Sequence, residues 1–144
     1  MAVTASWYGL AIKDIVCGTI DLQGDTFAAM LTTAYTPNVD TDRYRSTARA
    51  TELAYTSGYT VYTITGNTVT YDTGTNEIRW DFNDPTWTSA SFTCAQLVVF
   101  KLNGGTTTAD ELILYADFGG NEQVTSGTFS YVVPATGAGA ITVV

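Results

Sequence analysis

Carboxylates are the residues of this 144-residue chain that come nearest to catalytic chemistry. The sequence contains no histidine, so a general base near neutral pH would have to be a carboxylate, a lysine, a tyrosine or a thiol. Asp81 with Asp84, or Glu77 with Asp117, could form the acid and base pair of a glycosidase. Carboxylates beside turns usually accept hydrogen bonds from nearby backbone N–H groups, and no nucleophile elbow or phosphate-binding loop is present. We therefore expect no enzymatic activity and no catalytic residues.

Metal-binding patterns are equally sparse. Cys17 and Cys94 are the only cysteines, and without a CxxC pair or a histidine they cannot build the usual zinc sites. Asp40 with Asp42, or the DFND segment at 81–84, offers too few oxygen ligands in the wrong spacing for a calcium loop. The sequence predicts no metal and no other cofactor. The two cysteines are expected to be free thiols, with a single bridge between them as the alternative.

Three of the six basic residues, Arg43, Arg45 and Arg49, gather just after the YTPN turn. In an extended chain all three would share one face, and Tyr44 would lie on the other. They could be a solvated strand edge whose charges discourage edge-to-edge pairing. They could instead form a contact arm at 36–50, which would suit an acidic partner such as another copy of the chain or a neighbouring subunit.

The three tryptophans are candidate platforms for sugar rings. Trp80 alternates with Ile78 and Phe82, a pattern that predicts an inward-facing side chain. Trp87 follows a proline turn and is the better candidate for exposure, although a tryptophan at such a corner also commonly closes a core. Trp7 belongs to the N-terminal segment.

Charge and composition exclude several classes of function. The net charge of −8 repels nucleic-acid backbones and acidic membranes, so we expect neither as a partner. Charged residues make up only 14% of the chain, which leaves a surface rich in threonine, serine, asparagine and glycine of the kind that suits packed assemblies. The start, MAVTASWYGLAIKDIV, has no basic n-region and no apolar run long enough to span a bilayer, so we expect synthesis in a cytoplasm.

The elements that would position these residues are almost all strands. Residues 5–16 have helical spacing and are followed by Gly18, which suits a helix end; after them β-branched and aromatic residues alternate between frequent turns. We expect a single all-β domain, 1–144, in which a short N-terminal helix precedes a two-sheet antiparallel β-sandwich or jelly roll, with a small closed barrel as the alternative. The expected strands are 19–23, 26–34, 51–56, 59–65, 68–72, 76–82, 91–102, 111–118, 127–133 and 139–143. Strand 91–102 becomes apolar on both faces towards its end and should be central and buried. Strands 68–72 and 76–82 should form a hairpin through the turn signal at 73–76.

The order of WYGLAIKDIV, YTPNVDTD, the DPTW turn and LILYADFGG resembles a family of small tailed-phage virion proteins. Members of that family look like head decoration (cement) or minor capsid proteins. Where the family pattern has a histidine after Asp-Thr, this chain has Asp42, so a pH-linked contact of that histidine is not implied here. The matching positions are Tyr8, Gly9, Tyr35, Thr36, Pro37, Asn38, Asp40, Thr41, Trp87, Asp117, Phe118 and Gly119.

The resemblance implies a structural protein on the exterior of the virion that binds the major capsid protein and stabilises the head. Weak contacts to a repeated lattice gain from avidity, so we expect a homo-oligomer, a trimer rather than a dimer. The alternative function is a tail-associated module that binds a receptor or a carbohydrate. The expected partner-contact residues are Tyr35, Pro37, Asn38, Asp40, Arg43, Tyr44, Arg45, Arg49 and Trp87.

Overall fold

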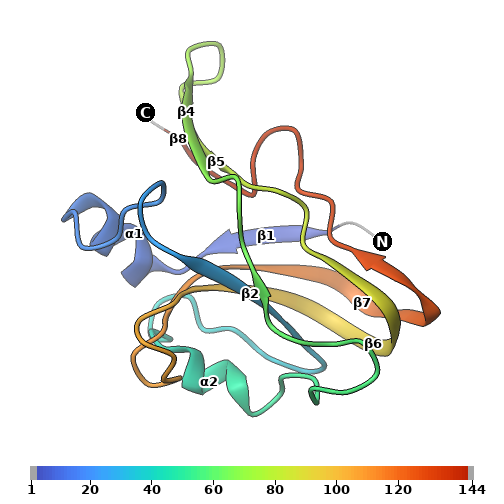
Figure 1. Ribbon diagram of the computed structural model, residues 1–144. Helices are drawn as coiled ribbons and strands as arrows, with labels where there is room; N and C mark the ends of the chain where they lie inside the picture. Colours follow the sequence, from blue (N-terminus) through green and yellow to red (C-terminus); the bar gives the residue numbers. More distant parts are fainter. Residues whose placement is uncertain (1–2, 143–144) are drawn as a thin grey trace.

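The computed structural model describes residues 3–142, which form two antiparallel sheets with two short helices beside them (Figure 1). The larger sheet has the strand order β1-β7-β6-β2-β3, and the smaller has the order β4-β5-β8. The prediction of an all-β chain is confirmed. The elements are β1 (Thr4–Trp7), α1 (Gly9–Val16), β2 (Phe27–Thr32), α2 (Arg45–Arg49), β3 (Tyr62–Thr63), β4 (Thr68–Asp72), β5 (Glu77–Asp81), β6 (Thr86–Lys101), β7 (Glu111–Ser130) and β8 (Gly139–Thr142).

The centre of the larger sheet comes from the most apolar runs of the sequence. Every residue of β2 is buried, and so is every residue of β6 from Cys94 to Phe100. These strands run antiparallel, with Ala29 opposite Val99, and β7 pairs with the other side of β6. A strand covered on both faces reads as a continuous apolar run, so the prediction of a buried central strand at 91–102 is confirmed in substance.

The smaller sheet stands up from one end of the larger one (Figure 1). The two sheets meet at Trp80 of β5, which is fully buried. Its ring centroid lies 4.9 Å from that of Phe27 in β2 and 5.9 Å from that of Trp7 in β1. Its indole N–H donates to the carbonyl of Leu22 over 3.1 Å. The prediction that Trp80 faces inward is confirmed, and this ring is the main joint between the sheets.

A bulge interrupts the pairing of β6 with β7. Gln96 lies opposite Asp117 and Cys94 opposite Glu122, so the four residues 118–121 of β7 face only Ala95. Gly119 has a φ of +75°, a backbone conformation that glycine adopts without a Cβ penalty. Bulges of this kind bend a strand and redirect its side chains. Here the bend sets Phe118 with its ring centroid 6.0 Å from that of Phe129, farther along the same strand.

The N-terminal segment differs from the expected helix over 5–16. Thr4–Trp7 is a strand, and the helix begins only at Gly9. The reason is long-range pairing, since β1 lies beside β7 with Trp7 opposite Leu114. Tyr8 is the N-cap of the helix and makes no side-chain capping bond.

The middle of the chain also departs from its prediction. The 36–50 segment is not a long loop, because residues 45–49 form α2 beneath the larger sheet (Figure 1). No strand occupies 19–23, and 51–56 contributes only an isolated bridge between Thr32 and Glu52. The predicted 68–72 and 76–82 hairpin is confirmed as β4 and β5. Strand 127–133 is absorbed into the long β7.

Candidate functional site

Arg43 lies inside the fold's ion pairs instead of on a free arm. Its Nη2 lies 2.7 Å from Asp14 of α1 and 3.0 Å from Glu111 of β7. The backbone is fixed as well, since the carbonyl of Arg43 accepts from Leu112 over 2.8 Å and Tyr44 forms a bridge with Glu111. Arg43 therefore ties the turn region to α1 and β7.

Arg45 is buried, with only 7% of the residue exposed. Its guanidinium lies 3.1 Å from Glu52 and 3.4 Å from Asp110, and its Cζ lies 4.3 Å from the ring centroid of Phe100. Arg49, which is exposed, pairs with the same Glu52 over 3.2 Å. The expectation that the three arginines share an exposed face is wrong, because a helix begins at Arg45 and turns its side chain into the protein.

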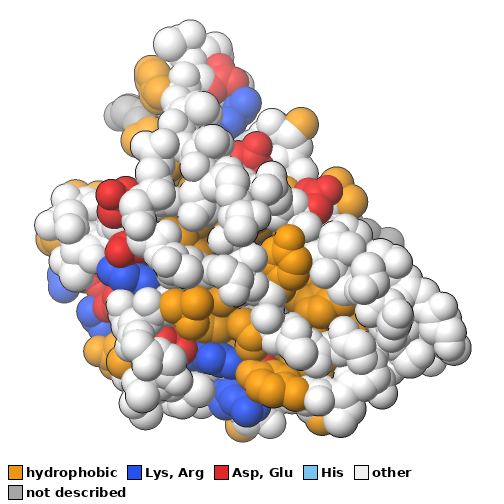
Figure 2. Space-filling model, viewed as in Figure 1, with side chains coloured by type: hydrophobic (Ala, Val, Ile, Leu, Met, Phe, Trp, Pro, Cys, Tyr) orange, Lys and Arg blue, Asp and Glu red, His pale blue; other side chains and the backbone are white. Residues whose placement is uncertain are grey.

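The basic residues are all used within the chain. All six Lys and Arg side chains lie within 4.0 Å of a carboxylate, and Figure 2 shows blue and red side chains side by side around the helices. Within residues 3–142, the carboxylates outside these pairs are Asp21, Asp40, Asp42, Asp81, Asp84, Asp117 and Glu122. The unpaired charge among the described residues is therefore negative.

Tyr35 and Asp42 belong to a buried network that fixes the YTPNVDTD turn. The hydroxyl of Tyr8 donates to that of Tyr35 over 3.1 Å, and Tyr35 donates to Asp42 over 2.6 Å. Asp42 also accepts from the backbone N–H of Asn38 over 2.8 Å. Burial raises the pKa of both Tyr8 and Tyr35, so both remain protonated donors. Asn38 and Asp40 are exposed beside this network.

Trp87 is buried, with 4% exposed, so the alternative that it closes the core is confirmed and the exposed platform is wrong. Its indole N–H donates to the carbonyl of Thr60 over 2.7 Å. The ring centroids of Tyr62 and Phe129 lie 5.7 and 6.0 Å away. The short strand β3 covers the indole, and a sugar ring has no access to its face.

The carboxylates weighed for catalysis have structural partners. Asp84 accepts from the backbone N–H of Val133, and Asp117 accepts from Gly119, each over 2.8 Å. Asp81 accepts from the N–H of the next residue, Phe82, and Glu77 pairs with Arg79. These are the turn and ion-pair roles that carboxylates beside turns commonly have.

The cysteines do not form a bridge. Cys17 is exposed and Cys94 is buried, and both are free thiols. Burial raises the pKa of Cys94 to about 12, which makes it a poor nucleophile. Over residues 3–142 the structure shows no group of three or more metal-ligating side chains and no helix long and apolar enough to cross a membrane.

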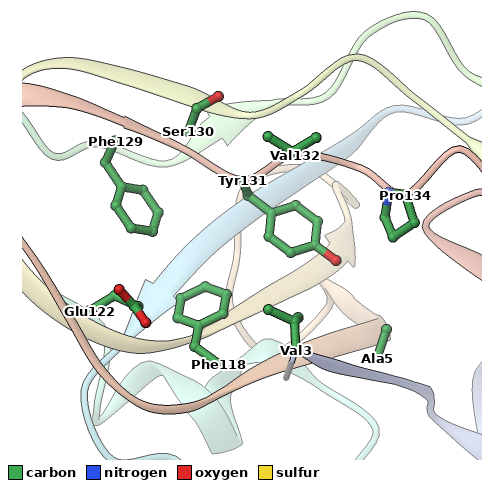
Figure 3. A pocket seen from close by; sticks show the side chains of 9 residues that line it. All are labelled: Val3, Ala5, Phe118, Glu122, Phe129, Ser130, Tyr131, Val132 and Pro134. Atoms are coloured by element: carbon green, nitrogen blue, oxygen red, sulfur yellow. The ribbon is translucent and has the colours of Figure 1, made fainter. Parts of the chain in front are cut away.

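An apolar groove runs beside β1 (Figure 3). One part has a volume of about 300 Å³ and the next about 340 Å³, and Val3, Ala5 and Pro134 line both. One wall is β1, and the other is the segment 131–139 after β7. The remaining side chains of the first part include Phe118, Glu122, Phe129, Ser130, Tyr131 and Val132.

Two polar atoms in this groove are buried and lack a partner among the described residues. They are the Oη of Tyr131 and the Nε1 of Trp7. In Figure 3 the hydroxyl of Tyr131 points into the space bounded by Val3, Ala5 and Pro134. Burial raises the pKa of Tyr131, so its hydroxyl stays protonated. A buried polar group without a partner costs about 1–3 kcal/mol, so two such groups in one groove mark a place where an acceptor is missing.

Sequence reasoning missed this groove. Its walls come from opposite ends of the chain, and the bulge that shapes it depends on strand register. The only local signals were the glycines at 119 and 120 and Pro134, which predict irregular backbone without saying what lies opposite.

Comparison with known proteins adds no relative. No protein-family model matches the chain, and neither the curated proteins nor the solved structures include a match. Function is therefore inferred from the residues and their arrangement.

Proposed function

We propose that the protein is a tailed-phage virion protein that binds the outside of the head and stabilises it, as a decoration or cement protein. One observation carries the proposal: the motif positions that resemble the phage family meet in space. Tyr8 bonds Tyr35, and the N–H of Gly9 donates to the carbonyl of Val39 within YTPNVDTD over 2.9 Å. Motifs that contact one another in the fold are expected to occur together in proteins that share this fold.

The motif positions in the second half of the chain also lie close together in the fold. Trp87 of the DPTW turn and Phe118 of the LILYADFGG segment both pack near Phe129, each with a ring centroid 6.0 Å from it. Because the resembling motifs pack together in this aromatic cluster, the proposal takes the sequence resemblance to reflect a similar fold. In this proposal the two sheets are a variant of the β-sandwich, joined through Trp80.

The charge distribution supports binding to a capsid lattice, but through a segment that carries an unpaired carboxylate and not through a basic arm. The arginines are paired within the chain, so the proposal places the contact on the exposed side of 36–50, which presents Asn38, Asp40 and Tyr44 on a fixed backbone. A fixed contact segment loses little conformational freedom on binding. The partner in this proposal is a basic patch of the major capsid protein. Oligomerisation, with a trimer preferred, would multiply modest contacts.

The test is the location and copy number of the protein in purified virions. Antibody-gold labelling over the head, with hundreds of copies relative to the major capsid protein, is the expected result. Heads that lack the protein should then lose DNA at a lower temperature. Labelling at one tail end with a few copies would overturn the head assignment and favour the tail-module alternative.

A further inference from the structure

The strand β1 has one side free. Among residues 3–142 it is the outermost strand of the larger sheet, and its one pairing partner there is β7. Tyr8, directly after β1, donates its N–H to the carbonyl of Ile113 over 3.0 Å. Inward and outward backbone groups alternate along an antiparallel strand, so the N–H and C=O groups of Ala5 and Trp7 point away from β7.

The opposite wall of the groove, the segment 131–139, directs several of its backbone N–H groups to partners other than β1. In the segment 131–139, the N–H groups of Tyr131, Val133 and Ala138 donate to Pro85, Asp84 and Trp80, respectively. Pro134, which lines both parts of the groove, has no N–H to offer. Within the described residues, the groove thus has a free strand edge on one side and an apolar wall on the other.

The unpaired groups identify the kind of ligand that fits. The protonated hydroxyl of Tyr131 can donate into the groove, so the ligand must carry an acceptor there, whereas the indole of Trp7 is covered by Gly139. The edge of β1 requires alternating donors and acceptors along a line. An extended polypeptide supplies both and can fill the apolar space with side chains, whereas an acyl chain lacks the polar groups.

The charge of the groove indicates which charge a bound peptide should carry. Glu122 lines the groove and is exposed, and no lysine or arginine lines either part. Asp117 lies opposite Thr4, at the same end of β1. A basic residue in the bound segment would meet uncompensated negative charge at this end.

We propose that this groove binds an extended peptide segment of a partner protein, added as a strand to the free edge of β1, with apolar side chains in the groove and a lysine or arginine near Glu122. The site is separate from the 36–50 segment. The inference goes beyond the capsid role, and it holds for any partner that presents such a segment.

The first experiment is a titration of the full-length, nitrogen-15-labelled protein with the acetylated, amidated hexapeptide KVTVTV. We expect the amide resonances of Ala5 and Trp7, which face away from β7, to shift. The indoles of Trp80 and Trp87 already donate within the fold, so their resonances serve as internal controls and should not move. No shift of the Ala5 and Trp7 amides at millimolar peptide, or shifts confined to residues away from β1, would overturn the proposal.

Two N-methylated peptides test strand addition itself. One carries methyl groups on the odd-numbered amides and the other on the even-numbered amides. Only alternate N–H groups of an added strand face β1, so one peptide should lose about tenfold or more in affinity while the other binds like the parent. Equal affinities for the two methylated peptides would contradict an added strand.

Two protein variants test the groove contacts. Tyr131→Phe should weaken the parent peptide several-fold, whereas Tyr71→Phe, on the exposed small sheet, should have no effect. Glu122→Gln should remove the preference for KVTVTV over EVTVTV. Unchanged affinity in Tyr131→Phe together with an unchanged charge preference in Glu122→Gln would refute the assignment. These results do not depend on where the protein lies in a virion, so the groove and the head assignment can fail separately.

Discussion

The Nη2 atom of Arg45 lies 3.1 Å from the Oε2 atom of Glu52, and the two side chains are 8% and 0% exposed. A cation and a carboxylate in such a place depend on each other, because either one left alone would be a buried, uncompensated charge. Tyr59 also donates to Glu52 over 2.9 Å. The pair therefore belongs to the interior that holds α2 against the larger sheet.

Neutralising Glu52 should destabilise the fold strongly. We expect Glu52→Gln to lower the free energy of unfolding by about 3–5 kcal/mol, since Arg45 would lose the nearer of its two carboxylate partners inside the protein. Urea denaturation measures the change. The matched control is Arg49→Ala, which removes the exposed partner of the same carboxylate and should cost at most about 1 kcal/mol. Similar losses in the two variants would contradict a buried role for Arg45.

The contact segment can be tested without disturbing the fold. Asp40 is exposed, so Asp40→Lys should leave the unfolding free energy within about 0.5 kcal/mol while weakening binding to purified heads. Arg43→Ala is the informative comparison, since it breaks pairs with Asp14 and Glu111 and should lower the melting temperature. Heads that bind Asp40→Lys as well as the wild type would remove the segment from the interface.

The packing of Trp80 between the two sheets predicts a large loss of stability when its ring is removed. Trp80→Ala should cost about 3–5 kcal/mol, because it removes a fully buried ring packed against both Phe27 and Phe82. Tyr71→Ala, on the exposed face of the small sheet, should cost far less. The free energies from chemical denaturation decide this, and a mild effect of Trp80→Ala would mean that the sheets are held together elsewhere.

The thiols should differ sharply in reactivity. In the folded protein we expect one equivalent of a thiol reagent to react, at Cys17, and a second to react only after denaturant is added, because Cys94 is buried. The pKa of Cys94 is raised to about 12 from its usual value of 9.0, so its contribution to stability is complete below pH 9 and declines as the pH rises towards 12. Cys94→Ala should flatten that part of the alkaline stability profile. Fast reaction of both thiols in the native state would contradict this placement.

The hydroxyl of Tyr131 should be dispensable for folding. Because it has no hydrogen-bond partner among the described residues, Tyr131→Phe should leave the melting temperature unchanged or raise it slightly. Thermal unfolding monitored by circular dichroism measures this, with Tyr35→Phe as the contrast, since that change removes hydroxyl bonds to Tyr8 and Asp42. A clear loss of stability in Tyr131→Phe would show that the hydroxyl is already engaged within the fold.

Local pattern was enough to predict several elements. The alternation around Ile78, Trp80 and Phe82 predicted β5 and its buried ring, and the apolar run that ends at Phe100 predicted the buried centre of β6. Both features depend on neighbours in the sequence, so the sequence contains the necessary information. The turn signal at residues 73–76 likewise predicted the hairpin of the small sheet.

The features that escaped prediction depend on distant partners. Residues 5–7 continue the helical spacing of 8–16, yet pairing with β7 makes Thr4–Trp7 a strand. Arg45 looks like a surface residue until Glu52 and Asp110 are placed around it. Nothing near Trp87 in the sequence reveals that β3 covers it, so local pattern could not decide between exposure and a place in the core. The groove required both ends of the chain and the register of a bulged strand.

The free side of β1 also bears on solubility. An uncovered strand edge can pair with the same edge of another molecule, and β1 contains neither a proline nor a charged residue to prevent this. The excess of carboxylates outside ion pairs keeps molecules apart at neutral pH through mutual repulsion. That protection fades as the solution approaches the isoelectric point near 4.1, where this protein should precipitate by edge-to-edge association while each molecule is still folded.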